Sequence, residues 1–172
     1  MEDNDGGWIV ILRRKTDVSQ RVNFRRTWDE YVHGFGDLNT EFWYGLRNIH
    51  CLTTRQQIDL QLVLNYTNGT SHRWIYHQFV VDRPEDKYTL HIGEAEGPNA
   101  LDSMAYNNGY PFSTYDNDND HSSGSCSQSR QGGGWWYNSC NYCELTRPHP
   151  QIWRSLYLDY AEMKVRSKQC NS

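Results

Sequence analysis

The stretch between Gly93 and Gly134 constrains the fold more than any other part of the sequence. Gly, Asn, Ser and Asp dominate it, and its apolar residues keep neither a helical nor a strand period. Segments of this length without regular structure are uncommon inside compact domains and are usually functional. We therefore expect a loop-rich half that depends on a bound ion or a disulfide for its order.

The rest of the sequence predicts an antiparallel sheet. Apolar runs or alternating apolar residues indicate strands over residues 8–12, 58–64, 74–81 and 88–92. Asn68-Gly69 favours a type I′ hairpin turn, because both central residues of that turn need a positive φ. The middle third is therefore expected to be an antiparallel meander.

Two short helices are also predicted. One helix face is indicated by the spacing of Trp28, Tyr31, Val32 and Phe35. Asn23 is the candidate N-cap of this helix. Thr53 and Gln56 have the spacing of a capping box, which predicts the start of a second helix.

The length of 172 residues is typical of one domain. We interpret residues 1–172 as a single α+β domain. Its sheet half covers 6–93, its loop-rich half covers 94–156, and a returning C-terminal strand covers 157–166.

Charge and motifs exclude several classes of function. The net charge is −4 and no long basic run interleaves with aromatic residues, so a nucleic-acid surface is not expected. The apolar run over 8–12 is far shorter than the roughly 20 residues of a membrane-spanning helix. The sequence has no nucleophile elbow, zinc-protease motif or phosphate-binding glycine loop, and we expect no enzymatic activity.

Three aspartates, Asp116, Asp118 and Asp120, alternate with asparagines in the loop-rich half. Calcium prefers several oxygen ligands whose charge compensates its own, so this run is a candidate calcium site. It is not an EF-hand, because His121 and Ser127 stand where that motif needs Gly and Glu. The alternative interpretation is a solvated acidic loop.

The five cysteines leave at least one without a partner in the chain. Cys126 and Cys140 bracket a Gly- and Trp-rich loop, and a disulfide between them would stabilise the fold by roughly 3 kcal/mol. Zinc is the alternative, because Cys140 and Cys143 have knuckle spacing that Cys126 or His149 could complete. Spacing alone assigns no partner to Cys51, Cys143 or Cys170.

Two acceptor sequences for N-glycosylation follow one another, Asn65-Tyr66-Thr67 and Asn68-Gly69-Thr70. Both lie at the expected hairpin turn, where a glycan can be accommodated. We expect glycosylation at Asn65 and Asn68 if the protein is secreted. The alternative is that these common triplets occur by chance.

An ordered set of motifs runs along nearly the whole chain: GW at 7–8, GFG at 34–36, EFWYGL at 41–46, FSTYDNDND at 112–120, GWWY at 134–137 and EMKVR at 162–166. Together these motifs resemble the fibrinogen C-terminal domain family. The lectin branch of the family, with ficolins and tachylectins, resembles the chain best, since the long coiled coils of fibrinogen chains are absent here. The resemblance implies an antiparallel sheet with short flanking helices and a calcium-binding, loop-rich C-terminal half.

The resemblance also implies particular site residues. Calcium would be bound by the carboxylates of Asp118 and Asp120 and by the backbone carbonyls of Ser122 and Gly124. A disulfide would join Cys126 to Cys140, and the peptide bond that precedes Cys140 would be cis. In acetyl-binding members the backbone amides at this bond hold an acetyl oxygen, which implies a ligand site at Gln131, Tyr137, Ser139, Cys140 and Asn141.

The chain departs from the lectin pattern at this site. Asn141 stands where the lectins usually have His, and Gln131 stands where a pocket Tyr is common. The segment 142–148 replaces a longer family stretch and shortens the loop that supplies another aromatic wall. We expect these departures to weaken acetyl binding.

The chain also begins where the family usually has a small N-terminal subdomain behind it, and we interpret Met1 as an internal start. Through that missing region the protein could form oligomers. The resemblance implies a secreted, extracellular, calcium-stabilised domain that binds acetylated or other surface glycans in innate immunity. The alternative is a fibrinogen-like module for a cell-surface or matrix protein, in which the lectin pocket is vestigial.

Overall fold

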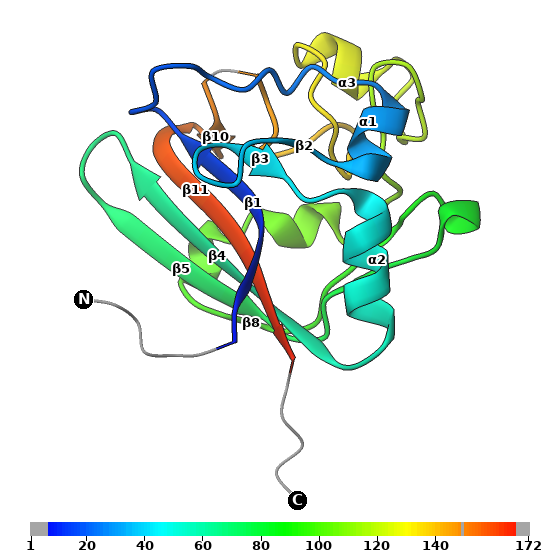
Figure 1. Ribbon diagram of the computed structural model, residues 1–172, viewed down its shortest axis with the longest axis horizontal. Helices are drawn as coiled ribbons and strands as arrows, with labels where there is room; N and C mark the ends of the chain where they lie inside the picture. The colour runs from blue at the N-terminus through cyan, green and yellow to red at the C-terminus, as the bar shows by residue number, and fades with distance from the viewer. Residues whose placement is uncertain (1–6, 149, 168–172) are drawn as a thin grey trace, which may run out of the picture.

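The computed structural model describes residues 7–148 and 150–167 (Figure 1). Within these residues, nine strands form one antiparallel sheet whose main path runs β2-β3-β1-β11-β4-β5-β8, while β10 pairs with β11 and β9 pairs with β10. Its strands are β1 (Ile9–Lys15), β2 (Phe35–Gly36), β3 (Phe42–Trp43), β4 (Ile58–Tyr66), β5 (Ser71–Tyr76), β8 (Ala95–Glu96), β9 (Cys143–Glu144), β10 (Ile152–Trp153) and β11 (Leu156–Ser167). A separate pair consists of β6 (Val80–Val81) and β7 (Leu90–His91).

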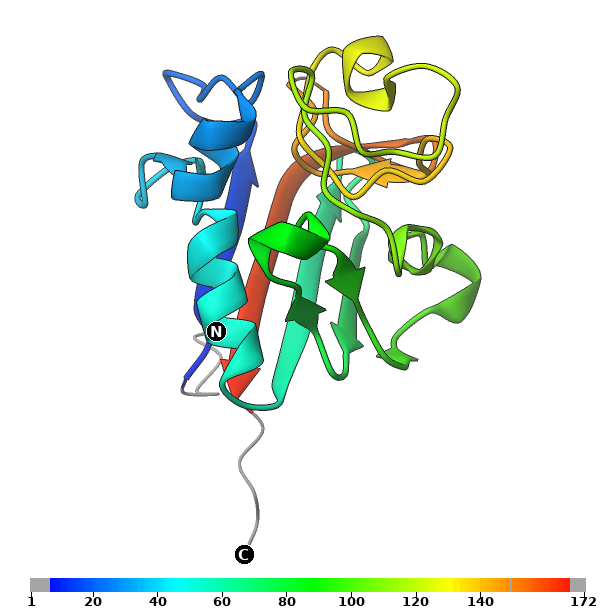
Figure 2. The same cartoon turned by 90° about the vertical axis from the view of Figure 1, so that its right-hand side faces the viewer.

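Short helices flank this sheet. The α-helices are α1 (Trp28–His33), α2 (Leu46–Thr54) and α3 (Cys126–Ser129), and the 3-10 helices are η1 (Pro84–Asp86), η2 (Asn99–Leu101) and η3 (Met104–Asn107). The fold is therefore α+β with a mainly antiparallel sheet, which confirms the expected class. Figure 2 shows α1 and α2 along one side of the sheet and the loop-rich residues gathered at its upper end.

The C-terminal strand β11 lies in the middle of the sheet. It pairs antiparallel with β1 on one side and with β4 on the other, so that Ala161 lies opposite both Arg14 and Leu64. The expected strand over 157–166 is confirmed. Its position joins the two ends of the described chain in one sheet.

The β4–β5 hairpin follows its sequence pattern. Leu60, Leu62 and Leu64 are fully buried on one face, as the alternation over 58–64 predicts. The turn contains Gly69 at a φ of 84°, in the left-handed region that glycine adopts without strain. The predicted hairpin is therefore confirmed, and it projects beyond the sheet in Figure 1. The predicted type I′ turn is wrong, because Gly69 N donates to Tyr66 O, which makes Thr67 and Asn68 the central residues, and neither has a positive φ.

The predicted cap of the first helix is wrong. Thr27, not Asn23, is the N-cap of α1, and Thr27 and Glu30 form a reciprocal capping box. Asn23 instead accepts a hydrogen bond from the backbone N–H of Arg25, in a turn before the helix. Thr27 and Glu30 are three residues apart, as a capping box requires. Sequence reasoning applied this spacing to Thr53 and Gln56 and so assigned the capping box to the second helix.

The predicted start of the second helix is also wrong. Thr53 lies in the last turn of α2, which begins after Gly45 and ends at Thr54. Gly45 has a φ of 100°, and a Cβ there would lie 2.8 Å from the His33 carbonyl. Thr53 Oγ1 accepts a hydrogen bond from Val81 N, so this threonine joins α2 to β6 rather than capping a helix.

The predicted strand over 74–81 is interrupted. β5 ends at Tyr76 and β6 begins at Val80, and the intervening Gln78 has a φ of 57°. A strand cannot continue through a residue in the left-handed region. The chain bends there, and Phe79 N instead donates a hydrogen bond to Ile58 O.

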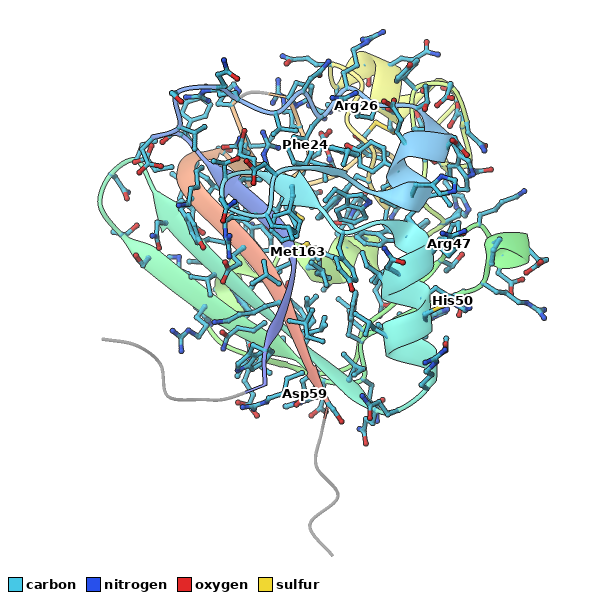
Figure 3. All side chains as sticks on the ribbon, viewed as in Figure 1. Phe24, Arg26, Arg47, His50, Asp59 and Met163 are labelled. Carbon is cyan, nitrogen blue, oxygen red and sulfur yellow. A yellow bond between two sulfur atoms is a disulfide. The ribbon has the colours of Figure 1, made fainter. Side chains whose placement is uncertain are left out.

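The core is rich in packed aromatic rings. Trp43, Phe112 and Trp136 lie within about 6 Å of one another by ring centroid, and all are essentially buried. Trp136 and Phe112 come from the loop-rich half, whereas Trp43 comes from β3. Burial of these rings therefore fixes the loops against the sheet. Figure 3 shows the side chains around Met163 of β11, which is buried in the same core.

Candidate functional site

The loop-rich half is closed by a disulfide between Cys126 and Cys140. Cys126 begins α3, and the side chain of the preceding Ser125 caps that short helix. The peptide bond between Ser139 and Cys140 is cis, as the family resemblance implies. Because both sulfurs are bonded to each other, the alternative zinc site built on Cys126 and Cys140 is excluded.

The three aspartates of the acidic run have different environments. Asp116 Oδ1 accepts hydrogen bonds from the backbone N–H of Trp28 at 2.9 Å and from Thr114 Oγ1 at 2.7 Å. Trp28 is the first residue of α1, so Asp116 satisfies one of the free N–H groups at that helix start. Asp116 therefore joins the acidic loop to α1.

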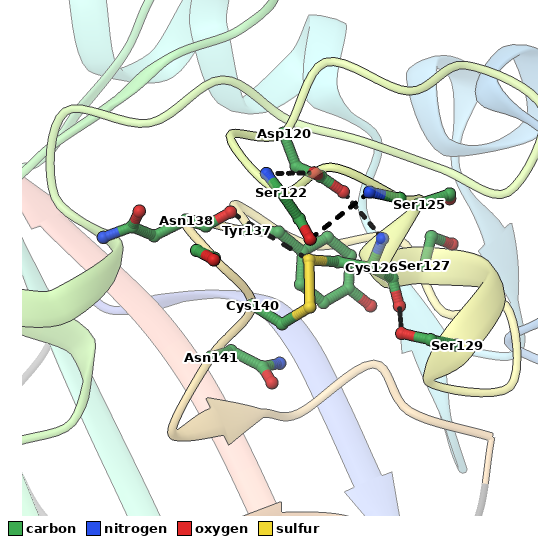
Figure 4. The surroundings of a disulfide bond; sticks show 12 residues. Asp120, Ser122, Ser125, Cys126, Ser127, Ser129, Tyr137, Asn138, Cys140 and Asn141 are labelled. Atoms are coloured by element: carbon green, nitrogen blue, oxygen red, sulfur yellow. Dashed lines mark hydrogen bonds between the residues drawn. A yellow bond between two sulfur atoms is a disulfide. The ribbon is translucent and has the colours of Figure 1, made fainter.

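Asp120 lies near the Cys126–Cys140 disulfide (Figure 4), and its backbone N–H donates to Asp118 Oδ1 at 3.3 Å. Asp120 Oδ1 accepts a hydrogen bond from Ser122 N at 2.8 Å, and Oδ2 accepts one from Cys126 N at 2.7 Å. Burial and the neighbouring Asp118 carboxylate raise the pKa of Asp120 above its usual range. A cation between these carboxylates would relieve that repulsion, and Ser122 and Gly124 follow closely enough to offer carbonyls.

No cluster of three or more His, Cys, Asp or Glu side chains suited to a metal ion occurs among residues 7–148 and 150–167. A calcium site here would therefore combine two carboxylates with backbone carbonyls. Backbone oxygens are ordinary calcium ligands, so this donor set fits the ion.

The predicted ligand site is exposed at Ser139 and Gln131 and partly exposed at Cys140 and Asn141. Among the described residues, the backbone N–H groups of Cys140 and Asn141 donate no hydrogen bond to a backbone carbonyl. Tyr137 is different, because its side chain is fully buried. Its ring therefore does not wall a ligand at the surface, and that expectation is corrected.

A buried carboxylate lies directly beneath this site. Glu144 is fully buried and accepts hydrogen bonds from the Tyr137 hydroxyl at 2.6 Å and from Asn141 Nδ2 at 3.2 Å. Burial raises the pKa of Glu144 to about 7. Asn141 Oδ1 is buried and has no hydrogen-bond partner among the described residues. The hydrogen bond from Nδ2 to Glu144 is therefore what orients the Asn141 amide.

Sequence reasoning missed an aromatic pair beside the cis bond, in which Tyr142 is exposed and Tyr106 is half-buried. The rings of Tyr106 and Tyr142 lie 4.6 Å apart by centroid, and the Tyr106 hydroxyl donates to Ser139 O at 3.4 Å. Tyr142 is 58% exposed. Tyr106 comes from η3, far from Tyr142 in sequence, so no local spacing could have revealed the pair.

The remaining cysteines differ in exposure. Cys51 is exposed on α2, whereas Cys143 is fully buried with its sulfur 3.4 Å from Asn107 Oδ1. Burial raises the pKa of the Cys143 thiol well above its usual range. Cys170 and His149, which the sequence-based hypotheses also named, lie outside the described residues.

Residues 1–151 match the family model described as the C-terminal globular domain of fibrinogen beta and gamma chains. The chain belongs to this family. Its fibrinogen-like domain is thus a binding module rather than an enzyme, as the sequence predicts.

Fibrinogen-like protein A of Apostichopus parvimensis is 41% identical to the chain, over 98% of the chain and 63% of the relative. Tenascin of Gallus gallus is 36% identical, over 96% of the chain and 10% of tenascin. The chain therefore spans less than two thirds of the length of either relative. Tenascin and angiopoietin-related proteins are extracellular. No helix in the described part of the fibrinogen-like domain is long and apolar enough to cross a membrane.

Two solved structures have the same fold. The fibrinogen-like globe domain of human ANGPTL6 gives a TM-score of 0.88 at 34% identity and covers 98% of the chain and 82% of the globe domain. The second is lamprey fibrin D-dimer, which is complexed with the peptide Gly-His-Arg-Pro-amide. It gives a TM-score of 0.82 at 29% identity and covers 98% of the chain and 64% of the lamprey chain. None of these four relatives is named as a lectin, and membership in the lectin branch stays a hypothesis.

Proposed function

We propose that this fibrinogen-like domain is an extracellular recognition module that binds a carbonyl group of a protein ligand at residues 139–142. The observation that carries the proposal is the pair of backbone N–H groups at Cys140 and Asn141, which donate to no backbone carbonyl of the described residues and lie beside exposed Ser139. Unpaired N–H donors at the surface bind a carbonyl oxygen readily. Tyr142 supplies an aromatic surface next to them.

A protein ligand is favoured over an acetylated glycan. The acetyl-binding hypothesis places Tyr137 and a histidine beside the acetyl methyl group, but Tyr137 is buried and Asn141 lacks an imidazole ring. Exposed tyrosines are common anchors in protein interfaces. The lamprey relative is complexed with a peptide, which supports the same choice.

Calcium is proposed as the ion that stabilises the site. Asp118 and Asp120 would bind it through carboxylates, and Ser122 and Gly124 through backbone carbonyls. Support comes from geometry, since the backbone N–H of Asp120 donates to Asp118 Oδ1 at 3.3 Å and the two carboxylates belong to one short loop. Asp120 also accepts a hydrogen bond from Cys126, so bound calcium would stiffen the disulfide loop.

The purified domain, with calcium, tested on an array of extracellular protein domains and on a glycan array, separates the two ligand classes. We expect saturable binding to a protein that N-acetylglucosamine does not compete. Binding to acetylated glycans that requires calcium and is competed by N-acetylglucosamine would overturn the choice of ligand and favour a lectin of innate immunity.

A further inference from the structure

A polar groove of about 620 Å³ lies between the β4–β5 hairpin and the beginning of β11. None of the residues assigned to the ligand or calcium site lines it. Its volume falls within the range of roughly 300–1,000 Å³ that holds small ligands. The groove contains Asn65, the first of the two glycosylation sequences.

Asn65 lies on the exposed face of β4, between buried Leu64 and Tyr66. In the sheet it stands directly opposite Tyr160 of β11 on one side and Ser71 of β5 on the other. Directly opposite residues in an antiparallel sheet have Cβ atoms about 4.5–5.5 Å apart. The ring of Tyr160 is therefore a direct neighbour of the Asn65 side chain.

The Asn65 amide is oriented by one hydrogen bond. Ser71 Oγ donates to Asn65 Oδ1 at 3.0 Å, so the oxygen of the planar amide faces β5. The nitrogen, Nδ2, takes no part in this hydrogen bond, and its residue lines the groove together with Tyr160. Nδ2 is the atom that N-glycosylation modifies.

The groove offers polar groups to a sugar. Asp17 and Lys15 both line it, and within the described residues neither side chain has a hydrogen-bond or ion-pair partner. A carboxylate accepts hydrogen bonds from sugar hydroxyls, and an ammonium donates to them. An aromatic ring such as Tyr160 packs against the apolar face of a sugar ring.

We propose that Asn65 carries an N-linked glycan whose first N-acetylglucosamine lies in this groove, with one face on Tyr160 and its hydroxyls toward Asp17. The donor is a lipid-linked pyrophosphate oligosaccharide. A bond forms between Asn65 Nδ2 and the anomeric carbon, the bond from that carbon to the pyrophosphate breaks, and one amide proton leaves. The proposal requires secretion but does not depend on which ligand the domain binds.

Asn68 provides a control within the same hairpin. Its Oδ1 accepts hydrogen bonds from Thr70 N at 3.0 Å and from Thr70 Oγ1 at 2.7 Å, at the exposed turn. Asn68 does not line the groove. A glycan on Asn68 would therefore project into solvent without contacting the protein.

Site occupancy is tested by secreting the full chain from animal cells and mapping its glycopeptides by mass spectrometry. We expect a glycan on Asn65 in the wild type and in Asn68→Gln. The Asn65 glycan should be lost in Thr67→Ala, which keeps Asn65, and should return in Thr67→Ser, which restores an acceptor sequence. Secreted protein with Asn65 unmodified would overturn the proposal, whether or not Asn68 is modified.

The position of the sugar is tested by nuclear magnetic resonance on the glycoprotein. We expect the protons of the first N-acetylglucosamine to be shifted by the Tyr160 ring, relative to the denatured glycoprotein, and the shift to disappear in Tyr160→Leu. Tyr157→Leu is the matched control and should retain the shift. Sugar protons with identical shifts in wild type and Tyr160→Leu would show that the glycan does not lie in the groove.

Discussion

The Asp116 carboxylate accepts a hydrogen bond from the backbone N–H of Trp28 at 2.9 Å. This contact joins the acidic loop to the first residue of α1, which is 88 residues away in the sequence. It gives Asp116 a structural role and leaves Asp118 and Asp120 as the carboxylates of the proposed calcium site. The acidic run thus contains two kinds of aspartate with different consequences when they are mutated.

Asp116→Ala is expected to lower the free energy of unfolding by about 1 kcal/mol, the usual effect of removing a partner from a helix start. The loss should be the same with calcium and with a chelator, because Asp116 binds no ion in this account. Urea unfolding under both conditions measures it. A loss found only with calcium would place Asp116 among the ligands.

Asp120→Asn is expected to abolish the rise in melting temperature that calcium gives the wild type. The substitution removes one charge from the cage, and a ligand that binds the folded state stabilises it by mass action. Calorimetry with saturating calcium and with chelator measures the rise, and Asp116→Asn is the control that should keep it. Equal melting temperatures for the wild type in both conditions would contradict the calcium site.

Glu144 is expected to make the fold less stable as pH rises. Its folded pKa of about 7 is above that of an exposed glutamate, so the folded state binds the proton more tightly than the unfolded state. The stabilisation is complete below about pH 4 and is lost as pH rises through 7, a change of about 3 kcal/mol. Urea unfolding from pH 4 to 8 in chelator should show a smaller decline for Glu144→Gln, and an equal decline would contradict the assignment.

His77 should add a second decline, in a narrower range. Its ring nitrogens lie 3.0 Å from Asp59 Oδ1 and 2.9 Å from Glu96 Oε1, and these hydrogen bonds raise the pKa of His77 above 6.5. The protonated form is favoured in the fold, so its stabilisation is present below about pH 6.5 and is lost as pH rises through the raised value. Asp59 lies at the end of the sheet away from Arg26 (Figure 3).

His77→Gln should flatten the stability profile above pH 6 and leave the decline between pH 4 and 6 unchanged. Parallel unfolding series of the two single variants and of the double variant separate the two groups. The effects should add, because the two sites share no contacts. A His77→Gln profile that matches the wild type would remove the histidine from the account.

Thiol labelling should distinguish the cysteines. In a Cys170→Ser chain we expect rapid labelling of exposed Cys51, labelling of Cys143 only after denaturation, and a Cys126–Cys140 linked peptide without reductant. Peptide mapping before and after unfolding measures all three. Fast labelling of Cys143 in the folded chain would contradict its burial.

The sequence predicts those parts of the fold that local patterns determine. The leucines of β4 and the presence of a hairpin at residues 66–70 are correctly predicted, because period and turn residues act over a few positions. The type of the turn is not, since Asn68 does not adopt the positive φ that a type I′ turn requires. The start of α2 was missed, because Gly45 lacks a capping side chain and is selected by its φ and by close contact with His33. The helix start at Thr27 was overlooked in favour of Asn23, although its capping box with Glu30 was readable.

Site residues that belong to a local motif could be predicted from the sequence. Site residues whose position depends on tertiary contacts could not. The Cys126–Cys140 pair and the cis bond follow from the family resemblance. The burial of Tyr137 and its bond to Glu144 depend on how the loop packs, which no spacing encodes. The same holds for the pairing of Tyr106 with Tyr142.

Binding by a Tyr142→Ala variant tests the central claim, that the domain recognises a protein ligand at residues 139–142. Tyr157→Ala is the matched control, since Tyr157 is 55% exposed and Tyr142 is 58% exposed. For the protein ligand found on the array, we predict a dissociation constant at least about 10-fold weaker for Tyr142→Ala, as for an aromatic anchor in an interface, and unchanged for Tyr157→Ala. Unchanged affinity for Tyr142→Ala, with the fold and the calcium response intact, would contradict the account.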